Sequence, residues 1–154
     1  MAKKKPATVV NRLVIIGLGL IGSSLAASVR NKGLAKEVIG ISRRQSTLEI
    51  ALNNGIVDRC VDDFSQVAKE LEQGDIVVIG VPTLSVPSVL QECISQISPE
   101  VTVTDVASVK ESVVNSAVEL FGAVPPQLVP GHPIAGSEKS GVTAANPELF
   151  VDHR

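Results

Sequence analysis

Aromatic side chains are nearly absent from this chain of 154 residues, which contains three Phe and neither Trp nor Tyr. Single-stranded nucleic acid stacks its bases on aromatic rings, and nucleic acid in general is held by a basic surface. Here 14 basic residues stand against 16 acidic ones, and the formal net charge is -2. We therefore expect no nucleic-acid partner.

The sequence also lacks long apolar runs, a secretory signal and clustered cysteines. No apolar stretch reaches the roughly 18 residues of a membrane-spanning helix, because Gly, Ser, Asn or a charged residue interrupts each one. The basic run at residues 3–5 is followed by Pro6 and polar residues, unlike the long apolar region of a secretory signal. Cys60 and Cys93 form no CxxC pair and have no histidine cluster nearby, which predicts reduced thiols and no metal site. These features predict a cytoplasmic protein without a membrane partner.

Aliphatic residues must build the core, since 44% of the chain is hydrophobic and so little of it is aromatic. Apolar stretches of strand length alternate with stretches of helical spacing. The predicted strands are 12–17, 37–42, 75–81, 101–106 and 127–130, with a weaker one at 59–61. The predicted helices are 20–32, 46–54, 65–73, 85–97 and 109–121. This order predicts an α/β fold with a doubly wound, mainly parallel sheet, whose ligand lies at the carboxyl ends of the strands.

A glycine motif joins the first predicted strand to the first predicted helix. Gly17, Gly19 and Gly22, with Leu20 and Ile21 between the last two, form G-x-G-x-x-G. The first glycine permits a tight turn, the second lets a diphosphate approach the backbone, and the third lets the helix pack against the strand. Free N–H groups at the helix N-terminus then favour the phosphates. The motif predicts a Rossmann-type dinucleotide site; the alternative is a glycine-rich turn without a ligand.

The end of the second predicted strand indicates which dinucleotide binds. An NAD enzyme usually places a carboxylate there for the ribose 2′-hydroxyl, whereas this chain has Ser42, Arg43 and Arg44. Because two guanidinium groups suit a 2′-phosphate, we expect NADP as the preferred cofactor and NAD as the alternative. Arginines that merely solvate the start of a helix would give the same pattern.

Val81 and Pro82 end the predicted strand 75–81. In this architecture the corresponding loop lies beside the nicotinamide, and Pro82 restricts the backbone at the entry to the next helix. We therefore expect both residues to contact the cofactor. Taken alone, they would equally suit a plain strand-to-helix turn.

Two polar residues follow the later predicted strands. His132 lies between Gly131 and Pro133, in a loop with a stiff backbone. Imidazole exchanges protons near neutral pH, so this side chain suits removal of the proton from an alcohol as hydride leaves the carbinol carbon. Ser108 follows the neighbouring strand, where it would hydrogen-bond the same hydroxyl or orient the imidazole ring. A structural, hydrogen-bonded histidine is the alternative interpretation.

Four stretches of the chain together resemble one family. GLGLIG, ISRRQST, TDVASVK and GHPIAGSEKSG, in this order over residues 17–141, are similar to the N-terminal domain of the prephenate/arogenate dehydrogenases of tyrosine biosynthesis. The resemblance implies hydride transfer from the ring carbinol to NADP or NAD, with loss of the ring carboxylate as carbon dioxide. It implies that His132 is the base for the ring hydroxyl, that Ser108 shares this hydroxyl, and that Ser137 and Glu138 lie near the substrate's carboxylate end. ISRRQST most resembles the arogenate dehydrogenases that use NADP.

We expect a flexible tail at residues 1–10 and an NAD(P)-binding Rossmann domain at residues 11–154. Members of the family continue into a helical domain that forms a homodimer and supplies an arginine for the substrate carboxylate, and this sequence lacks that domain. We therefore expect the chain to bind cofactor but to turn over little substrate. One rival hypothesis is another two-domain dehydrogenase, of the β-hydroxyacid or 6-phosphogluconate type, although enzymes of those types lack an HPIAG-like loop. The other rival hypothesis is a non-catalytic module that senses dinucleotides.

Overall fold

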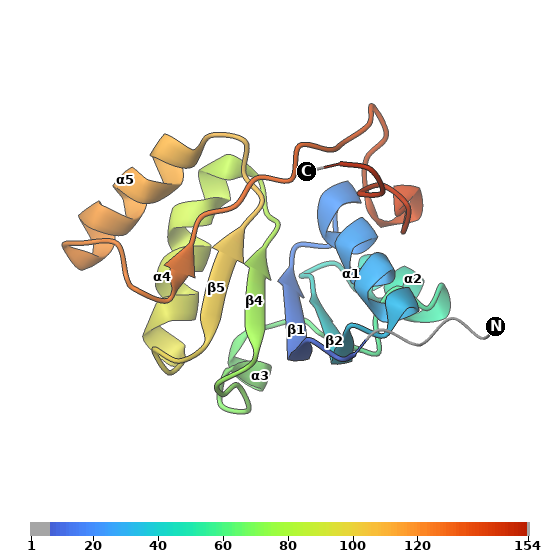
Figure 1. The fold of residues 1–154 in the computed structure, drawn as a ribbon, viewed down its shortest axis with the longest axis horizontal. Helices are drawn as coiled ribbons and strands as arrows, with labels where there is room; N and C mark the ends of the chain where they lie inside the picture. Colours follow the sequence, from blue (N-terminus) through green and yellow to red (C-terminus); the bar gives the residue numbers. More distant parts are fainter. Residues whose placement is uncertain (1–6, 154) are drawn as a thin grey trace.

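Six parallel strands form the centre of the computed structural model, which describes residues 7–153 (Figure 1). They are β1 (Val10–Ile16), β2 (Ala35–Ile41), β3 (Arg59–Val61), β4 (Ile76–Ile79), β5 (Thr102–Asp105) and β6 (Leu128–Val129). Neighbours pair in the order β3-β2-β1-β4-β5-β6, and all of these pairs are parallel. The order reverses between β1 and β4, which confirms the predicted doubly wound α/β fold and, with β3, the weakly predicted strand.

Helices cover both faces of the sheet (Figure 1). On one face lie α1 (Leu20–Lys32) and α2 (Gln45–Asn53). On the other face lie α3 (Ser65–Ala68), α4 (Val86–Gln96) and α5 (Lys110–Phe121). A short 3-10 turn, η1 (Thr83–Ser85), precedes α4, and a second one, η2 (Val142–Ala144), packs on the side of α1 and α2.

Alternate residues of β1 contribute to two separate cores. Leu13 and Ile15 belong to the cluster that includes residues of α1 and α2, whereas Val14 and Ile16 belong to the cluster that includes residues of α3, α4 and α5. Because successive side chains of a strand point to opposite faces, a strand covered on both sides must be apolar throughout. Aliphatic residues satisfy this requirement, which explains how a chain so poor in aromatic residues builds a core.

The third helix is shorter than the sequence predicts. We expected a helix over 65–73, but α3 ends at Ala68. Beyond it the backbone turns toward the sheet, where the Glu72 N–H donates to the Asp75 carboxylate at 2.9 Å. The Arg12 guanidinium also donates to the Glu70 carbonyl oxygen at 3.0 Å. These tertiary hydrogen bonds take the place of the last helical turns, so the helical spacing of the segment is overridden.

The first part of the predicted tail, residues 1–6, lies outside the described residues. The last residue assigned to that tail, Val10, already belongs to β1, and its N–H donates to the Leu34 carbonyl oxygen at 3.0 Å. Among residues 7–153, no helix combines the length and the apolar character needed to cross a membrane. Cys60 and Cys93 are both free thiols, and burial raises the pKa of Cys93 to about 12.

Candidate functional site

The glycine turn between β1 and α1 is built by close backbone approaches. Gly17 has a φ of 96°, a conformation that residues with a side chain rarely adopt. A Cβ at Gly17 would lie 2.5 Å from the carbonyl oxygen of Gly80, and a Cβ at Gly22 would lie 2.2 Å from the carbonyl oxygen of Gly17. Glycine at these two positions therefore lets the ends of β1 and β4 and the first turn of α1 pack directly against one another.

Gly19 differs from these two glycines because a Cβ there would meet no atom within 4 Å. It is the N-cap residue of α1, and no side chain caps this helix. The first turn of a helix leaves N–H groups without helical acceptors and carries a partial positive charge. The open space beside Gly19 and these uncapped N–H groups fit the diphosphate of a dinucleotide.

Beside the turn lies a pocket of about 330 Å³, which we call the strand-edge pocket. It is formed where β1, β2, β3 and β4 end and where α4 begins. Of the residues predicted to contact the cofactor, it brings together Gly17, Ser42, Arg43, Arg44, Val81 and Pro82. Three motifs that are far apart in the sequence therefore line one pocket at the switch point of the sheet.

The strand-edge pocket also contains acidic residues that the sequence analysis missed. Asp62 and Asp63 follow β3, and Glu92 lies on α4. The pKa of the Asp63 carboxyl is below its ordinary value, first because of hydrogen bonds from the Ser65 hydroxyl and backbone N–H, and with a smaller contribution from the Arg43 charge. Their position after a strand of the predicted sheet was the signal for Asp62 and Asp63, because parallel strands end at one edge.

Ser108 and His132 are both exposed and lie beyond β5 and β6. In the described part of the chain no hydrogen bond joins the two side chains. Their loops are instead connected through the carboxylate of Asp105, whose side chain is fully excluded from solvent. It accepts the Ala107 N–H at 2.9 Å and the Gly131 N–H at 3.2 Å.

Asp105 also forms an ion pair with the ammonium group of Lys110, at the start of α5. A buried carboxylate needs such a partner, since burying an unpaired charge is costly. Both residues lie within the TDVASVK stretch, and neither was predicted to belong to the site. The contact between Asp105 and Gly131 was not visible in the sequence, because it joins positions 26 residues apart.

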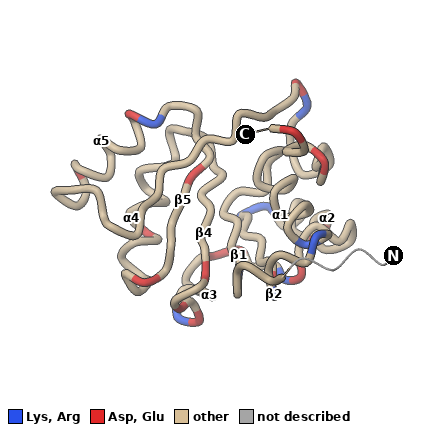
Figure 2. The backbone as a smooth tube through the Cα atoms, viewed as in Figure 1, with Lys and Arg blue, Asp and Glu red and all other residues tan. Residues whose placement is uncertain are grey.

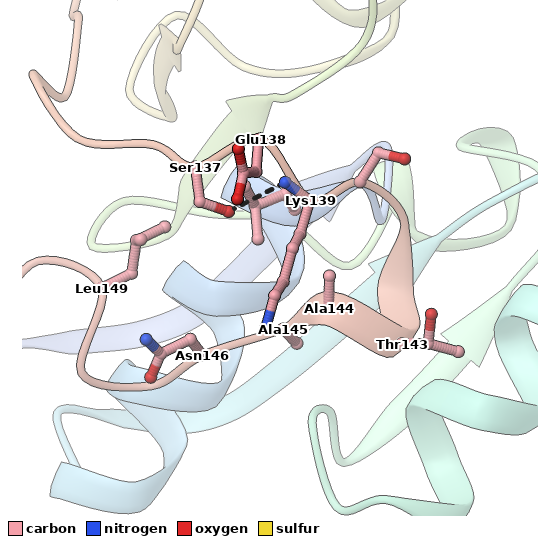
Figure 3. Close-up of a pocket in the computed structure, with 10 residues that line it drawn as sticks. Ser137, Glu138, Lys139, Thr143, Ala144, Ala145, Asn146 and Leu149 are labelled. Carbon is pink, nitrogen blue, oxygen red and sulfur yellow. Dashed lines mark hydrogen bonds between the residues drawn. The ribbon is translucent and has the colours of Figure 1, made fainter.

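A second, more open hollow of about 760 Å³ lies over the N-terminal end of α1; we call it the loop pocket (Figure 3). Leu20, Ser137 and Glu138, three predicted site residues, line it together with Lys139. The Ser137 hydroxyl accepts the Lys139 N–H at 3.1 Å. Figure 3 shows these loop residues facing the segment 143–146. Ser137 and Glu138 thus line the loop pocket, whereas Arg43 and Arg44 line the strand-edge pocket. The first turn of α1 borders the loop pocket.

A parallel sheet in this order, with a glycine turn and a pocket at its switch point, defines the class of Rossmann-type nucleotide-binding domains. A family model described as the nucleotide-binding domain of prephenate dehydrogenase matches residues 25–154. That match covers most of the chain, and the chain belongs to this family.

Characterised proteins of similar sequence and structure agree with the family. A prephenate dehydrogenase of Lactococcus lactis subsp. cremoris is 37% identical over an alignment of 144 residues, which covers 90% of this chain and 38% of that protein. Synechocystis arogenate dehydrogenase superimposes with a TM-score of 0.80 at 35% identity, over 92% of this chain and 48% of that one. Prephenate dehydrogenase from A. aeolicus, in complex with hydroxyphenyl propionate and NAD+, superimposes with a TM-score of 0.82 at 28% identity, over 93% of this chain and 48% of that one. This chain therefore spans less than half the length of each of these proteins.

Proposed function

We propose that the full-length protein carrying this domain oxidises and decarboxylates arogenate or prephenate, with hydride transfer to NADP or NAD. One observation carries the proposal: the strand-edge pocket unites the glycine turn with the arginines after β2 and the loop after β4. The family and the names of the similar dehydrogenases support the substrate class. The proposal extends beyond this chain, because the chain spans less than half the length of these relatives.

The chemistry requires a base at the hydroxyl oxygen and a hydride acceptor at the carbon of one carbinol group. A nicotinamide dinucleotide bound at the glycine turn supplies the hydride acceptor. His132 takes the proton of the ring hydroxyl, while Ser108 hydrogen-bonds the same oxygen. The ring carboxylate leaves as carbon dioxide, and its bonding electrons stay in the ring, which becomes aromatic. Ser137 and Glu138, in the loop pocket, then lie near the substrate's carboxylate end.

NADP is the preferred cofactor in this proposal. Arg43 and Arg44 line the strand-edge pocket, and no carboxylate ends β2, so the arrangement favours a 2′-phosphate over a bare hydroxyl. Asp62 and Asp63 line the same pocket and partly offset the positive charge. We therefore expect a preference for NADP together with measurable use of NAD.

The test is a steady-state assay of the full-length protein, with both substrates crossed against both cofactors. We expect turnover of arogenate or prephenate and a higher kcat/KM with NADP than with NAD. The isolated 154 residues should bind NADPH, detected by its fluorescence, and turn over little substrate. Lack of turnover with all four combinations would refute the proposed function. Dimerisation through a second domain and a cytoplasmic location stay predictions.

A further inference from the structure

Asp105 lies where the pairing between β5 and β6 ends. The two strands pair only at Val103 with Leu128 and at Thr104 with Val129. The next residue, Pro130, has no N–H to donate. The following N–H, of Gly131, donates to the side chain of Asp105 instead of to a backbone carbonyl. A carboxylate thus extends the sheet contact by one step, and the next residue in the chain is His132.

Packing around Gly131 holds the same loop against β5. A Cβ at this position would lie 3.0 Å from the Thr104 Oγ1 and 3.1 Å from the Asp105 carbonyl oxygen. Both distances are shorter than ordinary van der Waals contact, so a larger residue would require the loop or the neighbouring β5 atoms to shift by a few tenths of an ångström. The hydrogen bond and the close packing therefore act on the same stretch of backbone.

The other oxygen of Asp105 holds the loop that carries Ser108. Oδ2 accepts the Ala107 N–H and contacts the Lys110 ammonium, while Oδ1 accepts the Gly131 N–H. The two bound N–H groups each belong to the residue immediately before Ser108 or His132. A single buried carboxylate therefore bonds to the backbone immediately before each of these two side chains.

We propose that Asp105 is a positioning residue of the site, and that Lys110 compensates its buried charge. For activity this inference rests on the proposed function, but the geometry does not depend on it. Asparagine at position 105 has a similar size but only one acceptor oxygen, and its NH₂ group faces a donor. One of the two loops then loses its hydrogen bond, and a misplacement of about 1 Å can slow a reaction about a hundredfold.

A matched control is available at the opposite end of the sheet. Asp75 is likewise buried, and its carboxylate accepts the backbone N–H of Arg12 at 2.8 Å and of Glu72 at 2.9 Å, beside the Arg12 guanidinium at 3.0 Å. It has the same chemistry as Asp105 but touches neither Ser108 nor His132. Asp75→Asn therefore separates the loss of a buried carboxylate from the loss of site geometry.

The first experiment uses NMR on the 154-residue chain, which contains only two histidines, His132 and His153. Asp105→Asn should shift the imidazole signals of His132 and leave those of His153 unchanged, whereas Asp75→Asn should leave both unchanged. A His132 signal that is identical in wild type and Asp105→Asn would overturn the proposal. Because no substrate is involved, this result does not depend on the proposed function.

The second experiment measures kinetics of the full-length protein, with kcat expressed per cofactor-binding molecule. Asp105→Asn should lower kcat at least about tenfold and change the KM for cofactor less than about twofold. Asp75→Asn should leave kcat unchanged. A purely structural change lowers the number of folded molecules, and kcat is expressed per folded, cofactor-binding molecule. If Asp105→Asn does not fold, Gly131→Ala keeps the carboxylate, displaces the loop and should lower kcat by a few-fold. Wild-type kcat in the folded variant overturns the proposal, whereas an inactive wild type refutes only the proposed function.

Discussion

At the amino ends of the strands, several charged side chains are paired with one another, whereas at the carboxyl ends most of them face solvent. Arg12 contacts Asp75 at 3.0 Å, and Arg59 contacts Glu37 at 3.0 Å and Glu70 at 2.7 Å. The hydrogen bond with Arg59 holds the pKa of Glu70 below its ordinary value. Figure 2 shows the charged segments near α3 and the lower ends of the central strands. Arg12, Arg59 and their acidic partners therefore satisfy one another at the amino edge.

The carboxyl edge leaves its polar groups available. Gly19 caps α1 without a side chain, Arg43 and Arg44 are exposed, and so is His132. Asp105 is the exception, because its carboxylate is buried and paired. The difference indicates that the paired charges of the amino edge contribute to stability, whereas the exposed groups of the carboxyl edge are free to meet the proposed ligands. Asp105, the paired charge of the carboxyl edge, has the positioning role that we propose above.

The largest expected effect follows from removing the proposed base at the carboxyl edge. In the full-length protein, His132→Asn should lower kcat at least about a hundredfold, because asparagine cannot accept the hydroxyl proton. Cofactor affinity should change little, since His132 lies outside the strand-edge pocket. His153→Asn is the control and should behave as wild type. Steady-state kinetics with an NADPH fluorescence titration would check both, and wild-type turnover of His132→Asn would exclude it as the base.

Much of the fold was predictable because it depends on local patterns. Strands buried on both faces are apolar throughout, and the glycine turn lies between the first strand and the first helix, so the doubly wound parallel sheet and α1 were both accessible from the sequence. The end of α3 could not be predicted from the sequence. It depends on Asp75, whose partner Arg12 is 63 residues away, and no local pattern reports such a contact.

The residues of the candidate site likewise divide into those that local patterns predict and those that only long-range contacts reveal. The residues of the strand-edge pocket that belong to motifs were predicted, because each motif has its own composition and position. Asp62 and Asp63 were missed because the strand before them, β3, was only weakly predicted and they belong to no motif, although they line the same pocket as Arg43 and Arg44. Asp105 was missed because its contact with Gly131 joins positions 26 residues apart.

The second-largest effect is expected at the amino edge, where Asp75 is buried. Asp75→Asn should lower the free energy of unfolding by about 2 kcal/mol, because it removes a buried charge-assisted interaction and leaves one backbone N–H without an acceptor. NADPH affinity should stay unchanged, since Asp75 lies at the opposite edge. Urea unfolding followed by far-UV circular dichroism, beside an NADPH titration, measures both quantities. A parallel loss of affinity and stability would show that the two edges are coupled.

A smaller effect concerns the open space beside the glycine turn. Gly19→Ala should leave the Tm within a few degrees of wild type, because the added Cβ meets no atom within 4 Å. The Cβ would occupy the space proposed for the diphosphate, so the Kd for NADPH should rise at least about tenfold. Thermal unfolding with and without NADPH measures both. Unchanged affinity would place the diphosphate elsewhere.

The smallest expected effect tests which dinucleotide the carboxyl edge prefers. Replacing Arg43 or Arg44 by alanine should each raise the Kd for NADPH about fivefold, equivalent to one exposed charge-assisted hydrogen bond, and leave the Kd for NADH nearly unchanged. Asp62→Asn is the control variant in which the expected change in Kd has the opposite sign. It removes one of the carboxylates in the same pocket and should lower the Kd for NADPH about twofold. Equal losses for both nucleotides in the arginine variants would mean that the guanidinium groups hold the shared part of the dinucleotide, and the unpaired charges of this edge would then serve affinity without choosing between the two cofactors.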